Sequence, residues 1–183
     1  PKAEVKATKW ALLIVASKDP YGVKAGLSGI SDVRVSPMVY SRWNQSYVYQ
    51  GSTRLACYNY YTPPYTAGTY QNYYCGCVAT ALAQLMWYHK KPAVGIGQVT
   101  CLVRVNGAGP YSTKTRGGNG KGGVYDWANM PSDPGGLARA GRLNATQRAA
   151  IGALCHDAAV ASGMNFTPSG SSAPLCWSKG SHP

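Results

Sequence analysis

Two cysteines stand close together at the start of a long helix-forming segment. Cys75 precedes Gly76, and Cys77 opens a run that contains no helix-breaking residue before Pro92. The larger apolar residues in the run include Val78, Leu82, Leu85 and Met86. These residue types at these spacings predict a buried helix whose first turn carries a thiol.

A thiol in the first turn of a helix is a candidate nucleophile. The unpaired N–H groups at a helix N-terminus carry partial positive charge, which stabilises a thiolate and lets it attack a carbonyl carbon near neutral pH. We choose Cys77 over Cys75, because Cys77 begins the helical run whereas Cys75 lies in the approaching loop. The alternative is that Cys77 is a small buried residue without chemistry, which is the commoner fate of a cysteine.

The segment from Gly76 to Pro92 also carries a long and specific pattern. It reads G-C-V-A-T-A-L-A-Q-L-M-W-Y-H-K-K-P, and it resembles the nucleophile helix of the streptopain family of secreted bacterial cysteine proteases. The signature of that family is G-C-V-A-T-A-x-A-Q-x-M-x-Y-x-x-x-P. The resemblance implies a papain-like α+β fold with Cys77 as the nucleophile on the central helix.

A second resemblance concerns the segment that ends at Gln45. Residues 34–45 read R-V-S-P-M-V-Y-S-R-W-N-Q and resemble the V-x-P-L-x-x-x-x-W-x-Q pattern at the start of the mature family enzymes. The resemblance makes Gln45 an oxyanion-hole residue. Its side-chain amide and the backbone N–H of Cys77 would donate to the oxygen that gains charge during acyl transfer. An ordinary loop glutamine is the alternative.

The next segment departs from the family pattern. Residues 58–63 resemble the P-Y-N-x-x-x-P stretch that follows the family glutamine, but Cys57 replaces its first proline and Gln45 lies further away. This departure implies an inserted loop at roughly residues 46–56. Cys57 and Cys75 flank the loop that follows, and in an oxidising compartment we expect a disulfide between them, with two unpaired thiols as the alternative. With Cys77 set aside, the cysteines to be paired are Cys57, Cys75, Cys101, Cys155 and Cys176.

Two later stretches resemble further family motifs. Residues 125–131 resemble the structural Y-D-W-x-N-M motif, and we interpret Asp126 there as a turn cap rather than a catalytic acid. Residues 164–173 resemble a stretch that lines the substrate cleft of the family enzymes. This resemblance makes substrate-contact candidates of Gly170, Ser171 and Ser172, with a flexible turn as the alternative.

Other elements follow from local patterns. Residues 98–105 alternate and predict a strand, after which Asn106-Gly107 predicts a tight turn. The glycine-rich residues 114–123 lack the order of a phosphate-binding loop and predict a mobile surface loop. Residues 144–162 predict an amphipathic helix with a capping box. We expect His156 on this helix to pack or to lie at the surface. Its predicted apolar face consists of Ile151, Leu154, Cys155 and Ala158.

Composition limits the other classes of function. The chain has 183 residues and a net charge of +12, with 45% hydrophobic and 13% charged residues. Its basic residues are dispersed and accompany no nucleic-acid-binding motif, so we expect no nucleic-acid partner. No apolar stretch is long enough to span a membrane. The three histidines show no zinc-ligand spacing, and the predicted chemistry requires no metal or cofactor.

The catalytic base of the family has no counterpart in this sequence. The family histidine stands in a G-G-H-A-F-V segment, which does not occur here, and the terminal His182 does not match it. We therefore expect the His-bearing second lobe to be absent from this chain. The base would come from a second chain of the same precursor or from a longer protein of which this chain is a fragment, or a divergent C-terminus has removed catalysis.

The sequence therefore predicts two regions and one function. Residues 1–33 resemble a propeptide end, with an N-terminal arm as the alternative, and residues 34–183 form the nucleophile-bearing part of a protease domain. The predicted function is that of a secreted bacterial cysteine endopeptidase that acts on protein or peptide substrates through a thioester. A non-catalytic extracellular binding protein derived from the same fold is the alternative.

Overall fold

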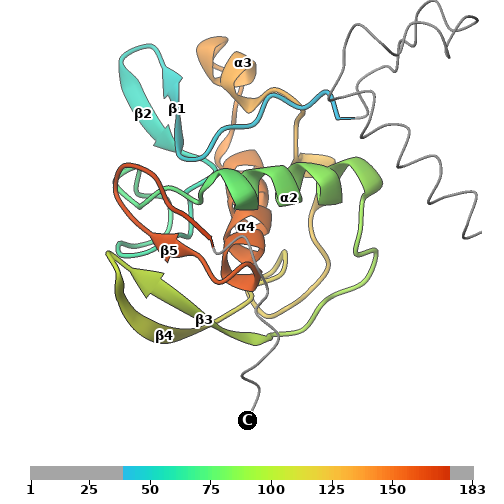
Figure 1. Ribbon diagram of the computed structural model, residues 1–183. Coiled ribbons are helices and arrows are strands. Elements are labelled where there is room, and N and C mark those ends of the chain that lie inside the picture. Colours follow the sequence, from blue (N-terminus) through green and yellow to red (C-terminus); the bar gives the residue numbers. More distant parts are fainter. Residues whose placement is uncertain (1–38, 174–183) are drawn as a thin grey trace, which may run out of the picture. The chain divides into compact units, whose positions relative to one another are not determined.

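The computed structural model describes residues 39–173 (Figure 1). The predictions for residues 1–33, Cys176 and His182 lie outside this part of the chain. The elements in chain order are β1 Tyr47–Gln50, β2 Thr53–Ala56, α2 Cys77–His89, β3 Thr100–Val105, β4 Ala108–Lys114, the short 3-10 helix η2 Trp127–Asn129, α3 Pro134–Arg139, α4 Ala145–Ala161 and β5 Asn165–Phe166.

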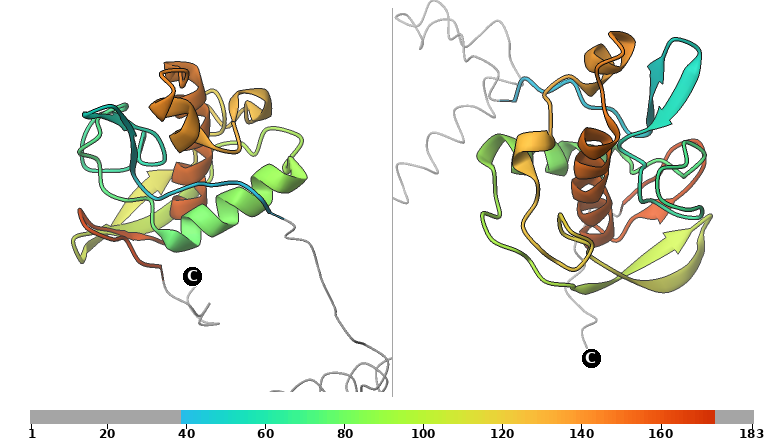
Figure 2. Two further views of the ribbon diagram at one scale, coloured as in Figure 1. Left: turned by 90° about the horizontal axis from the view of Figure 1, so that it is seen from above. Right: turned by 180° about the vertical axis from the view of Figure 1, so that it is seen from behind.

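Helix α4 lies in the middle of the described residues, and the other elements pack around it (Figure 2). Helix α2 crosses α4, and a sheet in the order β4-β3-β5 contacts α4 as well. Strand β3 is antiparallel to β4 and parallel to β5. Strands β1 and β2 form a separate antiparallel hairpin. This mixture of helices and strands confirms the predicted α+β class.

The sequence at its two ends explains where α4 starts and stops. The Asn144 side chain accepts a hydrogen bond from the backbone N–H of Gln147, and the Gln147 side chain accepts one from the N–H of Asn144. This is the predicted capping box. Gly163 follows the helix with φ 64°, a conformation that favours glycine. The prediction of one apolar face was too narrow, because every residue from Ala150 to Val160 is buried.

Helix α2 begins at Cys77, as predicted, but buries a different face. Its buried residues are Ala79, Thr80, Ala83 and Trp87. By contrast, Leu82 and Leu85 are 37% and 43% exposed, and Val78 and Met86 are only partly buried. The predicted buried face is therefore wrong. Apart from Trp87 the buried residues are small, which lets α2 pack closely on its neighbours, and the two leucines lie towards the outside.

A carboxylate on α4 organises the glycine-rich segment. Asp157 accepts hydrogen bonds from the backbone N–H groups of Arg116 and Gly117, both at 2.7 Å, and from the hydroxyl of Tyr125, also at 2.7 Å. Oδ1 of Asp157, which accepts from Arg116, also lies 2.8 Å from Nδ1 of His156, which is buried as a packing residue. Thr115, Gly117 and Gly122 are themselves buried. The predicted surface loop is therefore a folded segment fixed to α4.

Other motif residues have the structural roles that the sequence predicted. Asp126 caps η2, because its side chain accepts a hydrogen bond from the backbone N–H of Asn129. The segment after η2 holds two tryptophans by their indole N–H groups, since Trp87 donates to the carbonyl of Met130 and Trp43 donates to that of Pro131. The Asn106-Gly107 turn joins β3 to β4 with φ values of 51° and 77°.

The predicted disulfide between Cys57 and Cys75 is not formed. Both are unpaired thiols in the described residues, and both are buried. Cys155 on α4 lies beside Cys75, and hydrogen bonding to Cys75 together with burial raises the pKa of the Cys155 thiol. Burial likewise raises the pKa of Cys57. These thiols remain protonated and pack as small apolar residues.

We predict that Asp157→Asn lowers the free energy of unfolding by about 2 to 3 kcal/mol at pH 7, because it weakens charge-assisted hydrogen bonds. Burial opposes ionisation of Asp157, but hydrogen bonds from His156, Arg116, Tyr125 and Gly117 lower its pKa. The carboxylate therefore stabilises the fold fully above its unfolded pKa of about 3.9, and this contribution is lost as the pH falls through the lower folded pKa.

Urea unfolding from pH 7 down to pH 2.5 measures both effects. The Asp157→Asn variant is expected to lose less stability than the wild type over the acid end of this range. Asp126→Asn is the matched control, since Asp126 is exposed and asparagine caps a helix about as well as aspartate, so the change costs roughly a few tenths of a kcal/mol. Equal losses at pH 7 for the two variants would contradict the role given to Asp157.

Candidate active site

Cys77 is the first residue of α2, and it is exposed. The N-cap position before it is Gly76, whose φ of 91° and ψ of 154° are nearly restricted to glycine. No side chain of the described residues caps this end of the helix. The N–H groups of the first turn and the thiol therefore lie together at the surface, as nucleophilic attack and oxyanion binding require.

Gly76 is also held by close packing. A Cβ atom at this position would lie 2.9 Å from the Met164 side chain and 3.0 Å from the carbonyl oxygen of Ser171. The Thr80 hydroxyl lies 3.0 Å from the carbonyl oxygen of Gly76 and 3.1 Å from that of Asn44. Two segments that are far from Gly76 in the sequence, around residue 44 and at residues 164–171, thus fix the backbone immediately before the thiol.

Gln45 lies on one of these segments. The N–H of Cys75 donates to the carbonyl oxygen of Gln45 at 2.8 Å, and the N–H of Gln45 donates to the side chain of Asn44 at 2.7 Å. Gln45 is partly buried. The fold therefore brings Gln45 to the loop that carries the thiol, and its role in an oxyanion hole stays a prediction.

The three predicted substrate-contact residues lie on the other side of the same loop. Ser171 is buried, and its hydroxyl accepts from the N–H of Thr167 at 3.0 Å and donates to the carbonyl of Tyr74. Gly170 and Ser172 are exposed. Ser171 therefore positions the turn against the residues before Cys77, and only its two neighbours are exposed for contact with a substrate.

Neither histidine of the described residues is placed to act as the base for Cys77. His89 ends α2, and the helical rise of about 1.5 Å per residue puts it roughly 18 Å from Cys77. His156 instead lines a hollow with Tyr111 and Phe166, and its Nδ1 is held by Asp157. Between residues 39 and 173, no three His, Cys, Asp or Glu side chains gather as metal ligands. No helix in this range has the length and apolar composition needed to cross a membrane.

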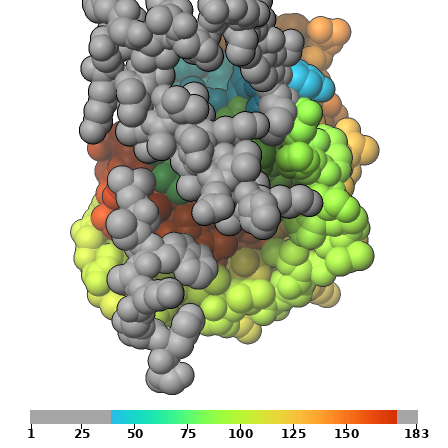
Figure 3. Space-filling model, turned by 45° about the vertical axis from the view of Figure 1, so that its right-hand side comes forward, coloured from blue at the N-terminus to red at the C-terminus, as the bar shows by residue number. Residues whose placement is uncertain are grey.

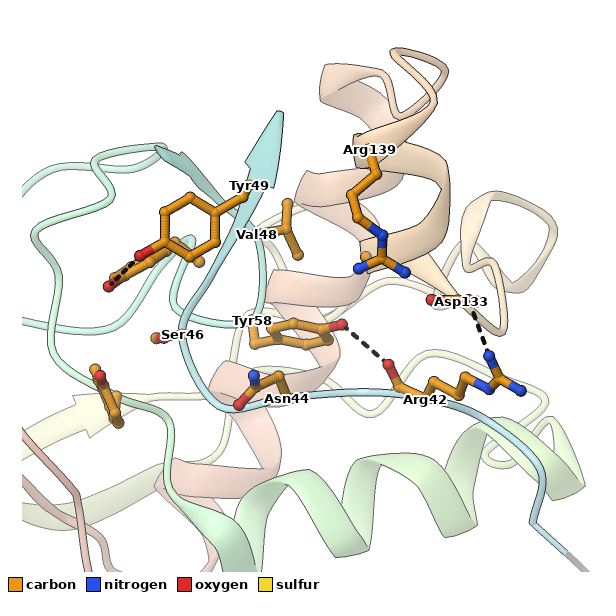
Figure 4. A pocket seen from close by; sticks show the side chains of 11 residues that line it. Arg42, Asn44, Ser46, Val48, Tyr49, Tyr58, Asp133 and Arg139 are labelled. Carbon is orange, nitrogen blue, oxygen red and sulfur yellow. Dashed lines mark hydrogen bonds and ion pairs between the residues drawn. The ribbon is translucent and has the colours of Figure 1, made fainter. Parts of the chain in front are cut away.

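A pocket of about 540 Å³ adjoins the Gln45 segment, and the sequence did not predict it (Figure 4). Its walls include Arg42, Asn44, Tyr49, Tyr58, Tyr74 and Arg139. One side comes from the segment that leads into the β1–β2 hairpin, and the other comes from α3. The tyrosines of residues 46–56 were the only sequence signal for it, because the arginines lie far apart in the chain.

Comparisons with known proteins agree with the resemblance seen in the sequence. The model of the peptidase C10 family matches residues 43–178. Among solved structures, the active wild-type interpain A cysteine protease of Prevotella intermedia is 32% identical, with a TM-score of 0.47, over 64% of this chain and 44% of that chain. A prointerpain A fragment from the same organism, in a cysteine-to-alanine mutant, is 24% identical, with a TM-score of 0.49, over 89% of this chain and 47% of that chain.

This chain therefore spans less than half the length of either of these two solved structures. The search of curated proteins found no match. The family match confirms the predicted papain-like fold, of which the chain holds a part. The activity of the whole protein is a separate question, because the match reaches only this part.

We predict that Gly76→Ala destabilises the protein by about 1 to 3 kcal/mol, since the backbone angles at this position strain any residue with a Cβ atom. The new methyl group would also press on Met164 and Ser171. Gly170→Ala is the matched control from the facing turn, where nothing lies within 4 Å of a new Cβ atom. Thermal unfolding of both variants measures the difference, and equal melting temperatures would show that the loop before Cys77 is not constrained.

Proposed function

This chain belongs to the peptidase C10 family, and we propose that it is the nucleophile-bearing part of a cysteine endopeptidase. The observation that carries the proposal is the position of Cys77, exposed in the uncapped first turn of α2. The backbone pairing of Cys75 with Gln45 supports it, because this pairing holds a glutamine at the loop that carries the thiol.

The proposed reaction has two steps. Sγ of Cys77 attacks the carbonyl carbon of a peptide bond, and the oxygen gains negative charge, which the backbone N–H of Cys77 and the Gln45 amide stabilise. The C–N bond then breaks, the amine leaves with a proton, and a thioester remains. Water attacks the thioester, which releases the acid and restores the thiol.

A histidine from outside the described residues is proposed as the base. It takes the thiol proton, gives it to the leaving amine and then activates the water. It belongs to a second chain of the same precursor or to a further part of a longer protein. The outer side of α2 supports a partner there, since Leu82, Leu85 and Tyr88 are 37%, 43% and 38% exposed and apolar surface of this kind favours contact with another surface. Figure 3 shows, in green, the face that α2 and the segment after it form.

Secretion and activation belong to the proposal as well. The family resemblance favours a secreted bacterial enzyme made as a zymogen, in which residues 1–33 end a propeptide. The proposed substrates are proteins or peptides. Peptide hydrolysis by this route uses a thiol and a base and requires no cofactor.

A non-catalytic extracellular binding protein is the second candidate. Two observations favour it: no histidine of residues 39–173 is placed beside Cys77, and exposed tyrosines gather on the β1–β2 hairpin and the loop after it. Tyr49, Tyr65 and Tyr70 are 49%, 57% and 40% exposed. Reactivity of Cys77 separates the two candidates, since a binding protein has no need of an activated thiol.

We predict that iodoacetamide labels Cys77 faster than a thiol in the unfolded chain, because the first turn of α2 stabilises its thiolate. Intact mass shows the number of labels, and peptide mapping locates them. Cys77→Ala is expected to lose the fast label, and Cys101→Ala is expected to keep it, since burial raises the pKa of the partly buried Cys101. If iodoacetamide labels Cys77 no faster than a thiol in the unfolded chain, the catalytic proposal is wrong and the binding protein remains as the candidate function.

We predict that Gln45→Ala lowers kcat for peptide hydrolysis by about 10² to 10³, because it removes one oxyanion donor. The measurement uses the protein form that contains the base. Labelling of Cys77 should stay unchanged, since the thiol keeps its helix terminus. Gln50→Ala, at the exposed end of β1, is the control and should keep full activity. A Gln45→Ala enzyme of normal kcat would show that the glutamine is an ordinary loop residue.

A further inference from the structure

The pocket beside the Gln45 segment is built from a part of the chain that departs from the family pattern. Residues 46–56, which the resemblance identifies as an insertion, form the β1–β2 hairpin. Ser46, Tyr47, Val48 and Tyr49 from the start of this hairpin line one side of the pocket. Asp133 and Arg139 line the other side (Figure 4). The pocket therefore depends on residues that depart from the family pattern, and no residue of the Gly76–Pro92 motif lines it.

Among the described residues, the charged side chains that line the pocket leave Arg139 without an ionic partner. Arg42 lies 3.8 Å from the carboxylate of Asp133, so these two charges offset each other. The side chain of Arg139 extends towards the pocket from α3 (Figure 4). Within residues 39–173, Arg139 forms no ion pair and its guanidinium donates no hydrogen bond. A guanidinium with unused donors favours a carboxylate, which it binds through two parallel hydrogen bonds.

Tyrosine rings form much of the remaining wall. Tyr58 is buried, and burial raises the pKa of its hydroxyl, so the ring stays neutral. The rings of Tyr47 and Tyr49 pack edge to face with centroids 5.3 Å apart, and the guanidinium of Arg54 lies 5.2 Å from the ring centroid of Tyr47. These contacts hold the rings in place. The neutral ring of Tyr58 offers apolar contact without competing with an incoming anion for Arg139.

The pocket lies next to the proposed catalytic residues. Asn44 and Ser46 line it and flank Gln45, and Tyr74 lines it three residues before Cys77. The backbone pairing of Cys75 with Gln45 joins the two segments at this point. The pocket wall and the loop that carries Cys77 therefore share these two segments.

We propose that this pocket is a specificity subsite that binds a carboxylate of the substrate peptide, with Arg139 as the group that selects it. The inference rests on the proposed function in one respect, namely that the occupant is the substrate of Cys77. An acidic side chain and a free peptide C-terminus present the same carboxylate. The experiment distinguishes these two sources.

The test measures binding of fluorescent peptides to the chain carrying Cys77→Ala, so that no turnover occurs. The peptides are identical except for Glu or Gln at one position, and each is made with a free and an amidated C-terminus. We expect the Glu peptide to bind about five- to tenfold more tightly than the Gln peptide at low salt, and less so at high salt. If the free C-terminus rather than the Glu side chain makes the peptides bind more tightly, the subsite binds the C-terminal carboxylate of the peptide. Equal binding of all four peptides overturns the proposal.

Two arginine variants separate a local contact from general attraction to a basic protein. Arg139→Gln is expected to remove the preference. Arg142→Gln makes the same change of charge at an exposed residue near α3 that does not line the pocket, and it should keep the preference. An equal loss in both variants would show attraction by net charge alone and would also overturn the proposal.

A protection experiment then tests whether the occupied pocket lies at the proposed active site. The Glu peptide should slow iodoacetamide labelling of Cys77 in the wild-type chain more than the Gln peptide does. Preferential binding without protection would mean that the pocket does not serve the thiol, which overturns the subsite. In a third outcome, the Glu peptide binds preferentially and protects Cys77, but Cys77 reacts no faster than a thiol in the unfolded chain. This outcome would support the binding site and contradict the catalytic proposal.

Discussion

A buried carboxylate is the interaction on which much of this fold depends. Asp157 is buried in the C-terminal part of α4, where an unpaired charge would be strongly unfavourable. Two backbone N–H groups of residues 116 and 117 and the hydroxyl of Tyr125 satisfy it, and all three come from the long connection between β4 and η2. Because this connection includes many glycines, it has few side chains of its own to bury. The hydrogen bonds to Asp157 on α4 hold this connection in a single conformation.

The loop that carries Cys77, the proposed nucleophile, is fixed in a different way, by close packing around its backbone. Gly76 lies against Met164 and Ser171, and the neighbouring N–H of Cys75 pairs with Gln45. Each of these contacts needs an exact separation between segments that are far apart in the sequence. The core around α4 supplies that separation, since α2 packs on it and the N–H of Met164 donates to the carbonyl of Ala159 on α4. The exposed thiol is thus positioned by buried residues that take no part in chemistry.

The features that the sequence predicted correctly are those that short-range interactions along the chain determine. The start of α2 at Cys77, the capping box of α4 and the Asn106-Gly107 turn each depend on neighbouring residues only, and all three were confirmed. The buried face of α2 and the Cys57–Cys75 disulfide were wrong, because they depend on which segment packs alongside. The neighbour of Cys75 proved to be Cys155 on α4. The pocket could not be predicted, since residues 42–49 and 133–139 meet only in the folded chain.

The separation of these features allows specificity to change without loss of the nucleophile. The backbone of the thiol loop tolerates almost no substitution at Gly76, because the space and the backbone angles there suit glycine alone. The hairpin at residues 47–56 is instead a two-stranded unit at the surface, and its strands pair only with each other. Changes in its length or its tyrosines alter the pocket wall, while Cys77 keeps the same helix and the same core. For the proposed subsite, a change in this hairpin is therefore a physically inexpensive way to alter which peptide binds.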